Sequence, residues 1–408
     1  MGIIKHLSAH EILDSRGNPT VEVTLTTNKV TVNAQVPSGA STGVHEALEL
    51  RDKEKRYQGL GVQKAIRNVN QIIAPKLIGK NCTYQQKIDK LLCSLDGTAN
   101  KSKLGANALL GVSLACAKAA AASQNQPLYQ YLNTLLKTKR KMIIPTPYLN
   151  SINGGKHADN DLAFQEFMLV PQCKTANENI RAASEIYHVL KKDIHKKYGK
   201  ATTNVGDEGG FAPPLKTVKA ALQILNQAIS DAGYKGKVTI AIDCAASEFY
   251  SKGKYRVDNK ALTKDQLLHL YLQLIREFPI SSIEDPFEQE DFAFFAQLRA
   301  KTNIQIVGDD LTVTNVQRLK TAIEHKSINC LLLKVNQIGT LSEALAAAEL
   351  AFRSDLKVMV SHRSGETVDT FIADLAVALG CGQIKAGAPC RGERVAKYNR
   401  LLEIEREI

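Results

Sequence analysis

The sequence predicts an α/β protein with two domains, a C-terminal eight-stranded β/α barrel of ββαα(βα)₆ type (135–408) and an N-terminal α+β cap domain (1–134). Three observations predict this architecture. Six apolar runs in the second half each end in a polar residue, at the spacing of a βα unit. Two further strand-like runs precede them with no helical pattern between. The first third of the chain passes from strand-like alternation to helical periodicity.

The cap domain is predicted from this change of period. Residues up to 37 alternate in strand fashion, with a turn at 14–19, and helical patterns follow at 62–73, 85–93 and 107–123. The segment 37–46 between them is rich in small residues and hydroxyls. Two interpretations of this segment are possible: it is a flexible surface loop, or it is a mobile lid that brings Ser41 to a ligand. The segment 135–141 is expected to connect the two domains.

The barrel begins with a predicted strand at 143–150, a loop at 153–158 and a second strand at 163–170 that contains Gln165 and Glu166. Two helices follow at 177–198 and 215–232, on either side of a loop at 204–214 that contains Glu208. Because the second strand follows the first without a crossover helix, we expect it to run antiparallel.

The six later strands end at polar residues separated by intervals of 23 to 41, each about one βα unit. These strand-end residues are Asp243, Glu284, Asp309, Lys334, His362 and Lys385. The carboxyl ends of the parallel strands share one face of a barrel, and that face carries the chemistry. The sequence therefore predicts an active site there. Residues 336–339, after Lys334, are expected to form a loop.

The composition is that of an ordinary globular protein, with 44% hydrophobic and 23% charged residues. Eight scattered cysteines without a Cys-x-x-Cys pair indicate neither a zinc site nor a disulfide framework, as expected in a reducing cytoplasm. The first residues are too polar for a signal peptide, and no apolar run is expected to reach transmembrane length. We therefore expect a cytoplasmic protein without membrane insertion.

The net charge of +12 is unusual. It indicates either a polyanionic partner or a generally basic proteome. The densest basic run, 191–200, falls at the end of a predicted helix, where cations complement the helix dipole. A solvated helix end is therefore favoured over a nucleic-acid contact, and no RNA-binding motif accompanies the run.

The strand-end residues predict a metal site and a proton-transfer site. Asp243, Glu284 and Asp309 form an all-carboxylate set of hard ligands that suits Mg²⁺. The alternative is three unrelated capping carboxylates. A cation beside Lys334 is expected to disfavour its protonated form, as a general base requires.

The remaining groups supply an anion site and an acid. Arg363 beside Ser364 suits a phosphate or carboxylate, and Glu166 and Glu208 offer a general acid. Together with a metal and a base, these groups suggest proton abstraction next to a carboxylate, with Mg²⁺ holding the charge that develops.

Ten short motifs carry a resemblance to a known family. They are SGASTG (38–43), NGGKHA (153–158), QEFM (165–168), GDEGGFAP (206–213), DCAASEF (243–249), SIEDP (282–286), GDDLTVTN (308–315), LLLKVNQIGT (331–340), SHRSGET (361–367) and IKAGAP (384–389). Along nearly its whole length the chain resembles the enolase family, in its bacterial form. A lysine or histidine base working with Mg²⁺ is already known for that superfamily.

The resemblance implies reversible dehydration of 2-phosphoglycerate to phosphoenolpyruvate. By resemblance, Lys334 is the base for the C2 proton, and Glu208, supported by Glu166, is the acid for the C3 hydroxyl. It further implies a first Mg²⁺ on Asp243, Glu284 and Asp309 and a second that Ser41 shares with the substrate phosphate. The implied substrate-binding residues are His157, Gln165, His362, Arg363, Ser364 and Lys385.

The resemblance also implies a homodimer or higher homo-oligomer, in which the C-terminal tail meets the partner near residues 16–22. In the family this tail commonly reads LLRIEEE. Here residues 401–406 carry Glu403 in place of the arginine and Arg406 in place of a glutamate. Two other readings are open. An acid-sugar dehydratase of the superfamily would not need Ser41, the 206–210 loop or the Arg363–Ser364 clamp. A protein that binds RNA, RNA machinery or a surface receptor would use the basic charge, and it could reach the cell surface or the medium without a signal peptide.

Overall fold

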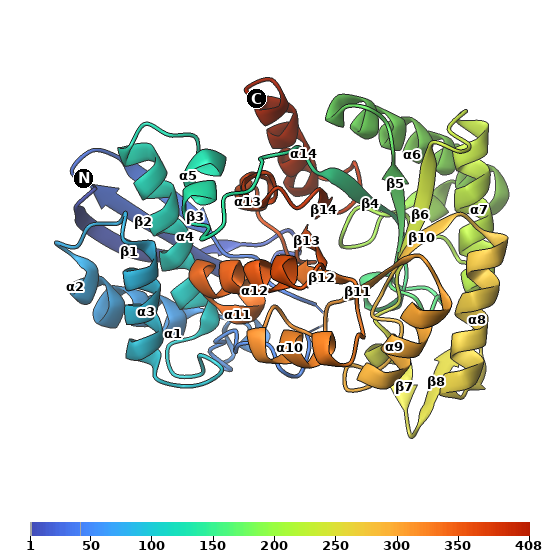
Figure 1. The fold of residues 1–408 in the computed structure, drawn as a ribbon, viewed down its shortest axis with the longest axis horizontal. Coiled ribbons are helices and arrows are strands. Elements are labelled where there is room, and N and C mark those ends of the chain that lie inside the picture. The colour runs from blue at the N-terminus through green and yellow to red at the C-terminus, as the bar shows by residue number, and fades with distance from the viewer. Residues whose placement is uncertain (1, 41) are drawn as a thin grey trace.

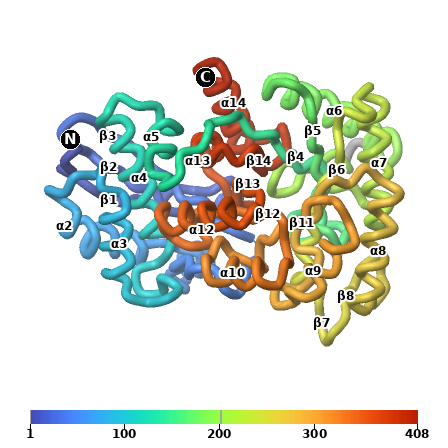
Figure 2. Tube along the Cα trace, viewed as in Figure 1, coloured from blue at the N-terminus to red at the C-terminus, as the bar shows by residue number. Residues whose placement is uncertain are grey.

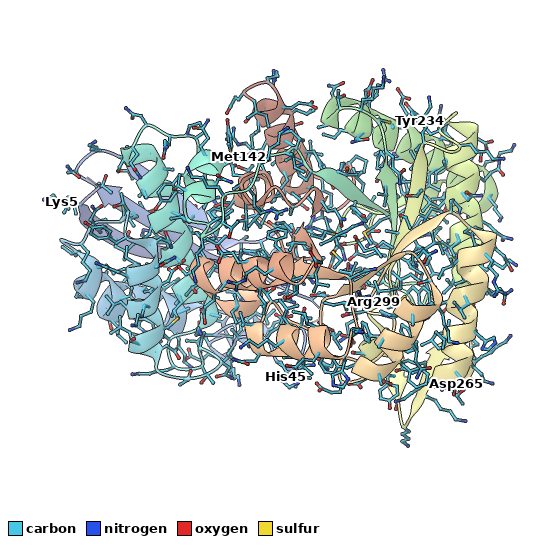
Figure 3. All side chains as sticks on the ribbon, in the orientation of Figure 1. Lys5, His45, Met142, Tyr234, Asp265 and Arg299 are labelled. Atoms are coloured by element: carbon cyan, nitrogen blue, oxygen red, sulfur yellow. The ribbon has the colours of Figure 1, made fainter. Side chains whose placement is uncertain are left out.

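The computed structural model describes residues 2–40 and 42–408. The cap-domain elements lie on one side of the molecule, at the left of Figure 1, and the barrel lies on the other. The last cap helix, α5, ends at Thr134, and the first barrel strand, β4, begins at Thr146. Met142, labelled in Figure 3, lies on the segment that joins them. The predicted boundary between residues 134 and 135 stays a prediction.

The cap domain is a three-stranded antiparallel sheet covered by helices. Its strands are β1 (Ile4–Leu13), β2 (Pro19–Thr27) and β3 (Thr31–Gln35), in the order β1-β2-β3. Strand β2 buries Val21, Val23 and Leu25 on one face, as its alternation predicts. The helical elements are α1 (Gln63–Arg67), a π-helical turn (Asn68–Ile73), α2 (Ala74–Leu77), α3 (Gln85–Asp96), α4 (Ala106–Ser123) and α5 (Leu128–Thr134).

Helix α4 is the core helix of the cap domain. It packs so closely on the sheet that a Cβ at Gly111 would lie 2.7 Å from Val23. It is also apolar and long enough to span a membrane by composition, so the expectation that no run reaches this length was wrong. However, 89% of the helix is buried inside the protein, as is typical of a core helix.

The barrel closes in the order β4-β5-β6-β10-β11-β12-β13-β14. Its strands are β4 (Thr146–Asn153), β5 (Glu166–Pro171), β6 (Val238–Asp243), β10 (Ile280–Glu284), β11 (Gln305–Gly308), β12 (Cys330–Leu333), β13 (Lys357–Ser361) and β14 (Gln383–Lys385). Strand β5 is antiparallel to both neighbours, as predicted. Its amino end therefore lies at the carboxyl rim of the others, and Glu166 pairs in register with Asp243 and Asn153.

Helices surround this barrel. They are α6 (Ala176–Tyr198), α7 (Val218–Asp231), α8 (Lys264–Glu277), α9 (Phe292–Lys301), α10 (Val316–Glu324), α12 (Leu341–Arg353), α13 (Phe371–Leu379) and α14 (Gly392–Glu405). The tube in Figure 2 shows the early, blue part of the chain passing beside the orange α10–α12 region. The backbone bond from Ala47 N–H to Gln337 O (2.8 Å) joins these distant segments.

Two details differ from the expected pattern. The 41-residue interval after Asp243 holds a small extra sheet, β7 (Tyr250–Ser251), β8 (Lys254–Val257) and β9 (Lys260–Leu262), which projects at the lower right of Figure 1. The expected loop after Lys334 is instead a short helix, α11 (Val335–Ile338). Gly339 ends it with a positive φ of 95°, a conformation that suits glycine.

Candidate active site

The carboxyl rim of the barrel gathers the predicted site residues. Asp243 and Glu284 end neighbouring strands and pair in register. Lys385 ends β14, and Asp309, Lys334 and His362 directly follow β11, β12 and β13. One cavity is lined by His157, Gln165, Glu166, Glu208, Lys334, Ser361, His362, Arg363, Ser364 and Lys385.

The Lys385 ammonium is surrounded by three carboxylates. Its Nζ lies 2.8 Å from Glu284 Oε1, 2.9 Å from Asp243 Oδ2 and 3.0 Å from Glu166 Oε1. All four side chains are buried. Burial alone would lower the pKa of Lys385, but these carboxylates raise it well above its usual value. One lysine therefore cannot neutralise all three carboxylates when all of them are ionised.

The predicted carboxylates fit a divalent cation. Glu284 Oε2 is buried and has no hydrogen-bond partner in the part of the chain that the structure describes. Burial and the neighbouring Asp243 raise the pKa of Glu284 well above its usual value. An oxygen that lacks a donor, among hard ligands that repel one another, is what an added Mg²⁺ would satisfy.

A second group of carboxylates lies alongside. Oxygens of Asp285, Asp309 and Asp310 lie within 4.8 Å of one another. However, Asp285 accepts the backbone N–H groups of Asp309 (2.9 Å) and Asp310 (2.7 Å). Asp285 therefore positions the loop that carries Asp309, and its oxygens are already engaged.

Lys334 contacts the same carboxylate group. Its Nζ lies 2.5 Å from Asp309 Oδ2. Burial, Arg363 and Lys385 each lower the pKa of Lys334, but carboxylates, Asp309 first and then Glu284, oppose them, and the net effect is a pKa above the usual value. The expectation that neighbouring cations disfavour protonated Lys334 agrees with the effects of Arg363 and Lys385, but it did not include the carboxylates that oppose them.

Two glutamates and two histidines form a separate group, here called the His–Glu cluster: Glu208, Glu166, His157 and His362. His157 Nδ1 lies 3.4 Å from Glu208 Oε1 and 3.9 Å from Glu166 Oε1, and His362 Nε2 lies 3.6 Å from Glu208 Oε1. Burial and the charge of Glu208 raise the pKa of Glu166 well above its usual value. Burial also favours protonated Glu208, but the two histidines and Arg394 lower its pKa well below the usual value. Glu166 is therefore the more readily protonated of the two glutamates.

The predicted anion clamp is joined to the predicted lid loop, residues 37–46. The Arg363 guanidinium donates to Glu46 Oε2 (2.9 Å), to Glu46 Oε1 (3.1 Å) and to Asn336 Oδ1 (3.0 Å). The Ala40 N–H donates to Ser364 Oγ (2.7 Å), and Ser38 pairs with Gly365. Figure 3 labels His45, at the lower edge of the view, and its ring contacts Glu290 at 2.7 Å. The lid loop is thus docked on the barrel rim, while Ser41 itself lies outside the described residues.

Sequence reasoning missed four residues of this region. Glu46 bonds to Arg363, and Asn150 donates to Glu208 Oε2 (2.9 Å). Gln337 donates to Asp309 Oδ1 (2.7 Å) and accepts from Thr314 Oγ1 (2.8 Å). Arg394 lies behind His362. In the sequence, these four residues are distinguished only as polar side chains within apolar or motif-rich stretches.

Comparison with known proteins agrees with this geometry. The family model described as "Enolase, N-terminal domain" matches residues 4–132, and "Enolase, C-terminal TIM barrel domain" matches residues 141–408. The chain is also 59% identical over 407 residues to an enolase of Methanocaldococcus jannaschii, covering 99% of this chain and 95% of that relative. The chain belongs to the enolase family. Enolases are carbon–oxygen lyases of the phosphopyruvate hydratase type that work with a divalent metal ion, and this chain is one of them. The acid-sugar dehydratase reading is thereby set aside.

Proposed function

We propose that this enolase interconverts 2-phosphoglycerate and phosphoenolpyruvate, with Lys334 as the base for the C2 proton and Glu208 as the acid for the C3 hydroxyl. The observation that carries the proposal is the lining of one cavity. It contains a lysine amine, a separate glutamate–histidine group and an arginine–serine anion clamp. Removal of a proton next to a carboxylate and loss of a hydroxyl need these three functions together.

Substrate binding is assigned to the clamp and the cavity walls. Arg363 presents a planar fork of N–H donors, and Ser364 adds a hydroxyl, which together suit a phosphate. His157, Gln165, His362 and Lys385 line the remaining cavity. The docked lid loop excludes water from the reacting atoms and so strengthens each charge interaction.

The carboxylates Asp243, Glu284 and Asp309 would hold the first of two Mg²⁺ ions, and Ser41 would complete a second one shared with the substrate phosphate. Mg²⁺ supplies the positive charge that stabilises the substrate carboxylate while the C2 proton leaves. Lys334 Nζ accepts that proton. Because Asp309 holds Lys334 in the free protein and favours its ammonium form, Lys334 has to leave this partner and release a proton to solvent before it acts as a base.

Glu208 then protonates the departing C3 hydroxyl. Glu166 is the more readily protonated of the two glutamates, so it is proposed to re-protonate Glu208 by way of His157, whose Nδ1 lies 3.9 Å from Glu166 Oε1 and 3.4 Å from Glu208 Oε1. The same groups return the proton in the hydration direction.

A direct assay tests this function. Purified protein with Mg²⁺ and 2-phosphoglycerate is expected to generate the ultraviolet absorbance of an enol phosphate, and omission of Mg²⁺ is expected to abolish it. Folded protein that produces no absorbance with both present would contradict the proposal.

We also propose a cytoplasmic homodimer or higher homo-oligomer, with any polyanion binding separate from catalysis. Lys191, Lys192, Lys196 and Lys197 are exposed on the C-terminal half of α6. Reversing Lys196 and Lys197 to Glu is expected to weaken RNA binding, if wild type binds RNA, and to leave turnover unchanged. A large loss of turnover would contradict this separation. A surface-receptor role stays a prediction.

A further inference from the structure

Arg394 is a fully buried cation that lies behind the His–Glu cluster. It belongs to α14, and none of its surface is exposed. Its guanidinium donates to the backbone oxygens of Asp207 (3.0 Å), Arg363 (2.6 Å) and Ser364 (2.5 Å). Gly387 leaves room for it, since a Cβ there would lie 2.7 Å from Arg394 Cδ. Arg394 thus joins the loop that carries Glu208 to the loop that carries the anion clamp.

Arg394 Nε also lies 3.3 Å from Glu393 Oε1, and a further contact of its guanidinium is with a histidine ring. Arg394 Nη1 lies 2.6 Å from His362 Nδ1. A guanidinium has only N–H donors and stays protonated in proteins, so Nδ1 has to be the acceptor. Burial, and then the positive charge of Arg394, keep the pKa of His362 well below its usual value, although Glu208 opposes this. The ring is therefore neutral, and its one proton has to be on Nε2.

This tautomer directs a donor at Glu208. His362 Nε2 is buried, has no hydrogen-bond partner within residues 2–40 and 42–408, and lies 3.6 Å from Glu208 Oε1. The charged groups that face the ring are Glu208, Arg394, Lys385 and Lys334. An N–H directed at a carboxylate stabilises its ionised form, so it helps an acid that has to release a proton.

We propose that Arg394 is a positioning residue that holds His362 as the neutral Nε2–H tautomer and so keeps a hydrogen-bond donor directed at Glu208. The proposal rests on the proposed role of Glu208 as the acid. It assigns His362 a fixed donor role, in which the ring neither accepts a proton from Glu208 nor serves as a base.

The first test uses the wild-type protein. Long-range ¹H–¹⁵N spectra of histidine-labelled protein report which ring nitrogen carries a proton, and the His362 signals are those lost in His362→Gln. We expect a protonated Nε2, an unprotonated Nδ1 and no titration between about pH 5.5 and 8. A protonated Nδ1, or an imidazolium at about pH 7, would overturn the proposal without any Arg394 variant.

The second test is a double-mutant cycle on kcat. Arg394→Met is expected to lower kcat by at least tenfold and by at most about 10⁴-fold. The upper value is the loss of kcat that a wrong histidine tautomer causes in a catalytic triad. In a His362→Gln background the same change is expected to lower kcat little further, because the residue through which Arg394 acts is gone. Arg394→Lys keeps a cationic donor, so it is expected to restore part of kcat and the Nε2–H signal.

Lys397→Met is the matched control. Lys397 is another fully buried cation on α14, but it pairs with Glu366 (2.8 Å) and does not contact His362. Lys397→Met is expected to leave the His362 tautomer unchanged. Its effect on kcat and that of His362→Gln are expected to multiply in the double variant. If Arg394→Met also combined multiplicatively, Arg394 would be only a structural residue. If wild type failed to dehydrate 2-phosphoglycerate, the proposed function would fail, while the spectra would still decide the tautomer.

Discussion

The Glu46 carboxylate of the lid loop accepts hydrogen bonds from both terminal nitrogens of Arg363, at 2.9 and 3.1 Å. The two residues are 317 positions apart in the chain. Glu46 also accepts the Gly43 N–H (3.1 Å) and the Gln337 amide, which in turn bonds to Asp309. One carboxylate therefore links the lid loop, the anion clamp and Asp309, one of the carboxylates of the proposed metal site.

The first prediction concerns Glu46. Glu46→Gln keeps the size of the side chain but removes the charge that orients Arg363. The loss of one charge-assisted bond, about 1.5–3 kcal/mol, is expected to raise the KM for 2-phosphoglycerate about tenfold or more, with a smaller effect on kcat. Glu290→Gln is the control, since the exposed His45–Glu290 pair also anchors the lid loop but is worth at most about 1 kcal/mol. Equal effects of the two substitutions on KM would contradict the role of Glu46.

The second prediction concerns the metal site. By calorimetry, the substrate-free protein is expected to bind one tight Mg²⁺, and a second only when substrate is present. Glu284→Gln removes a buried oxygen ligand of the tight site. It is expected to lower the Mg²⁺ affinity of that site by more than about 100-fold, since loss of a residue that only supports a ligand costs about 10–100-fold. Glu288 is a half-buried neighbour outside the ligand set. The Glu288→Gln variant is therefore expected to bind Mg²⁺ with wild-type affinity. Two equally tight ions without substrate would count against this site.

The third prediction concerns pH and stability. The pKa of His362 lies well below its usual value in the folded protein, so on acidification the unfolded chain takes up this proton first. The stability that neutral His362 contributes is complete above about pH 6.5 and is lost as the pH falls, by up to about 1.4 kcal/mol per pH unit. Urea unfolding of wild type and His362→Gln should therefore show wild type losing more free energy of unfolding toward about pH 5. Parallel curves would mean that the ring titrates normally.

The fourth prediction concerns the contact between the two domains. Buried Asp89, on α3, accepts the Ser342 N–H (2.9 Å) and hydroxyl (2.6 Å) in the first turn of α12. Asp89→Ala leaves that amide without its acceptor and is expected to lower the free energy of unfolding by about 1–3 kcal/mol. Asp265→Ala, which removes an exposed carboxylate from the first turn of α8, should cost only about 0.3–1 kcal/mol. A cost for Asp89→Ala no larger than this would contradict the proposed contact.

The barrel and much of its rim were predictable because strand spacing alone brings the ends of parallel strands together. Asp243 and Glu284 are neighbours for this reason, and the antiparallel β5 follows from a missing crossover. Contacts between distant segments were not predictable. Glu46 and Arg394 reach their partners only through tertiary packing, and the contact of Lys334 with Asp309, which raises the lysine pKa, was not predicted either. For Arg394 and Lys397, the available signal was a pair of cations on the buried face of a helix that also buries Tyr398 and Leu401.

The most direct test of the assigned base and acid separates the two halves of the reaction. Proton NMR of 2-phosphoglycerate in heavy water follows exchange of the C2 hydrogen independently of dehydration. Lys334→Ala is expected to abolish both, because no base remains. Glu208→Gln is expected to slow dehydration by about 10²–10⁴-fold, as for loss of a general acid, yet to keep C2 exchange, because the base is intact. Exchange that survives in Lys334→Ala but vanishes in Glu208→Gln would contradict the assignment and reverse the two roles.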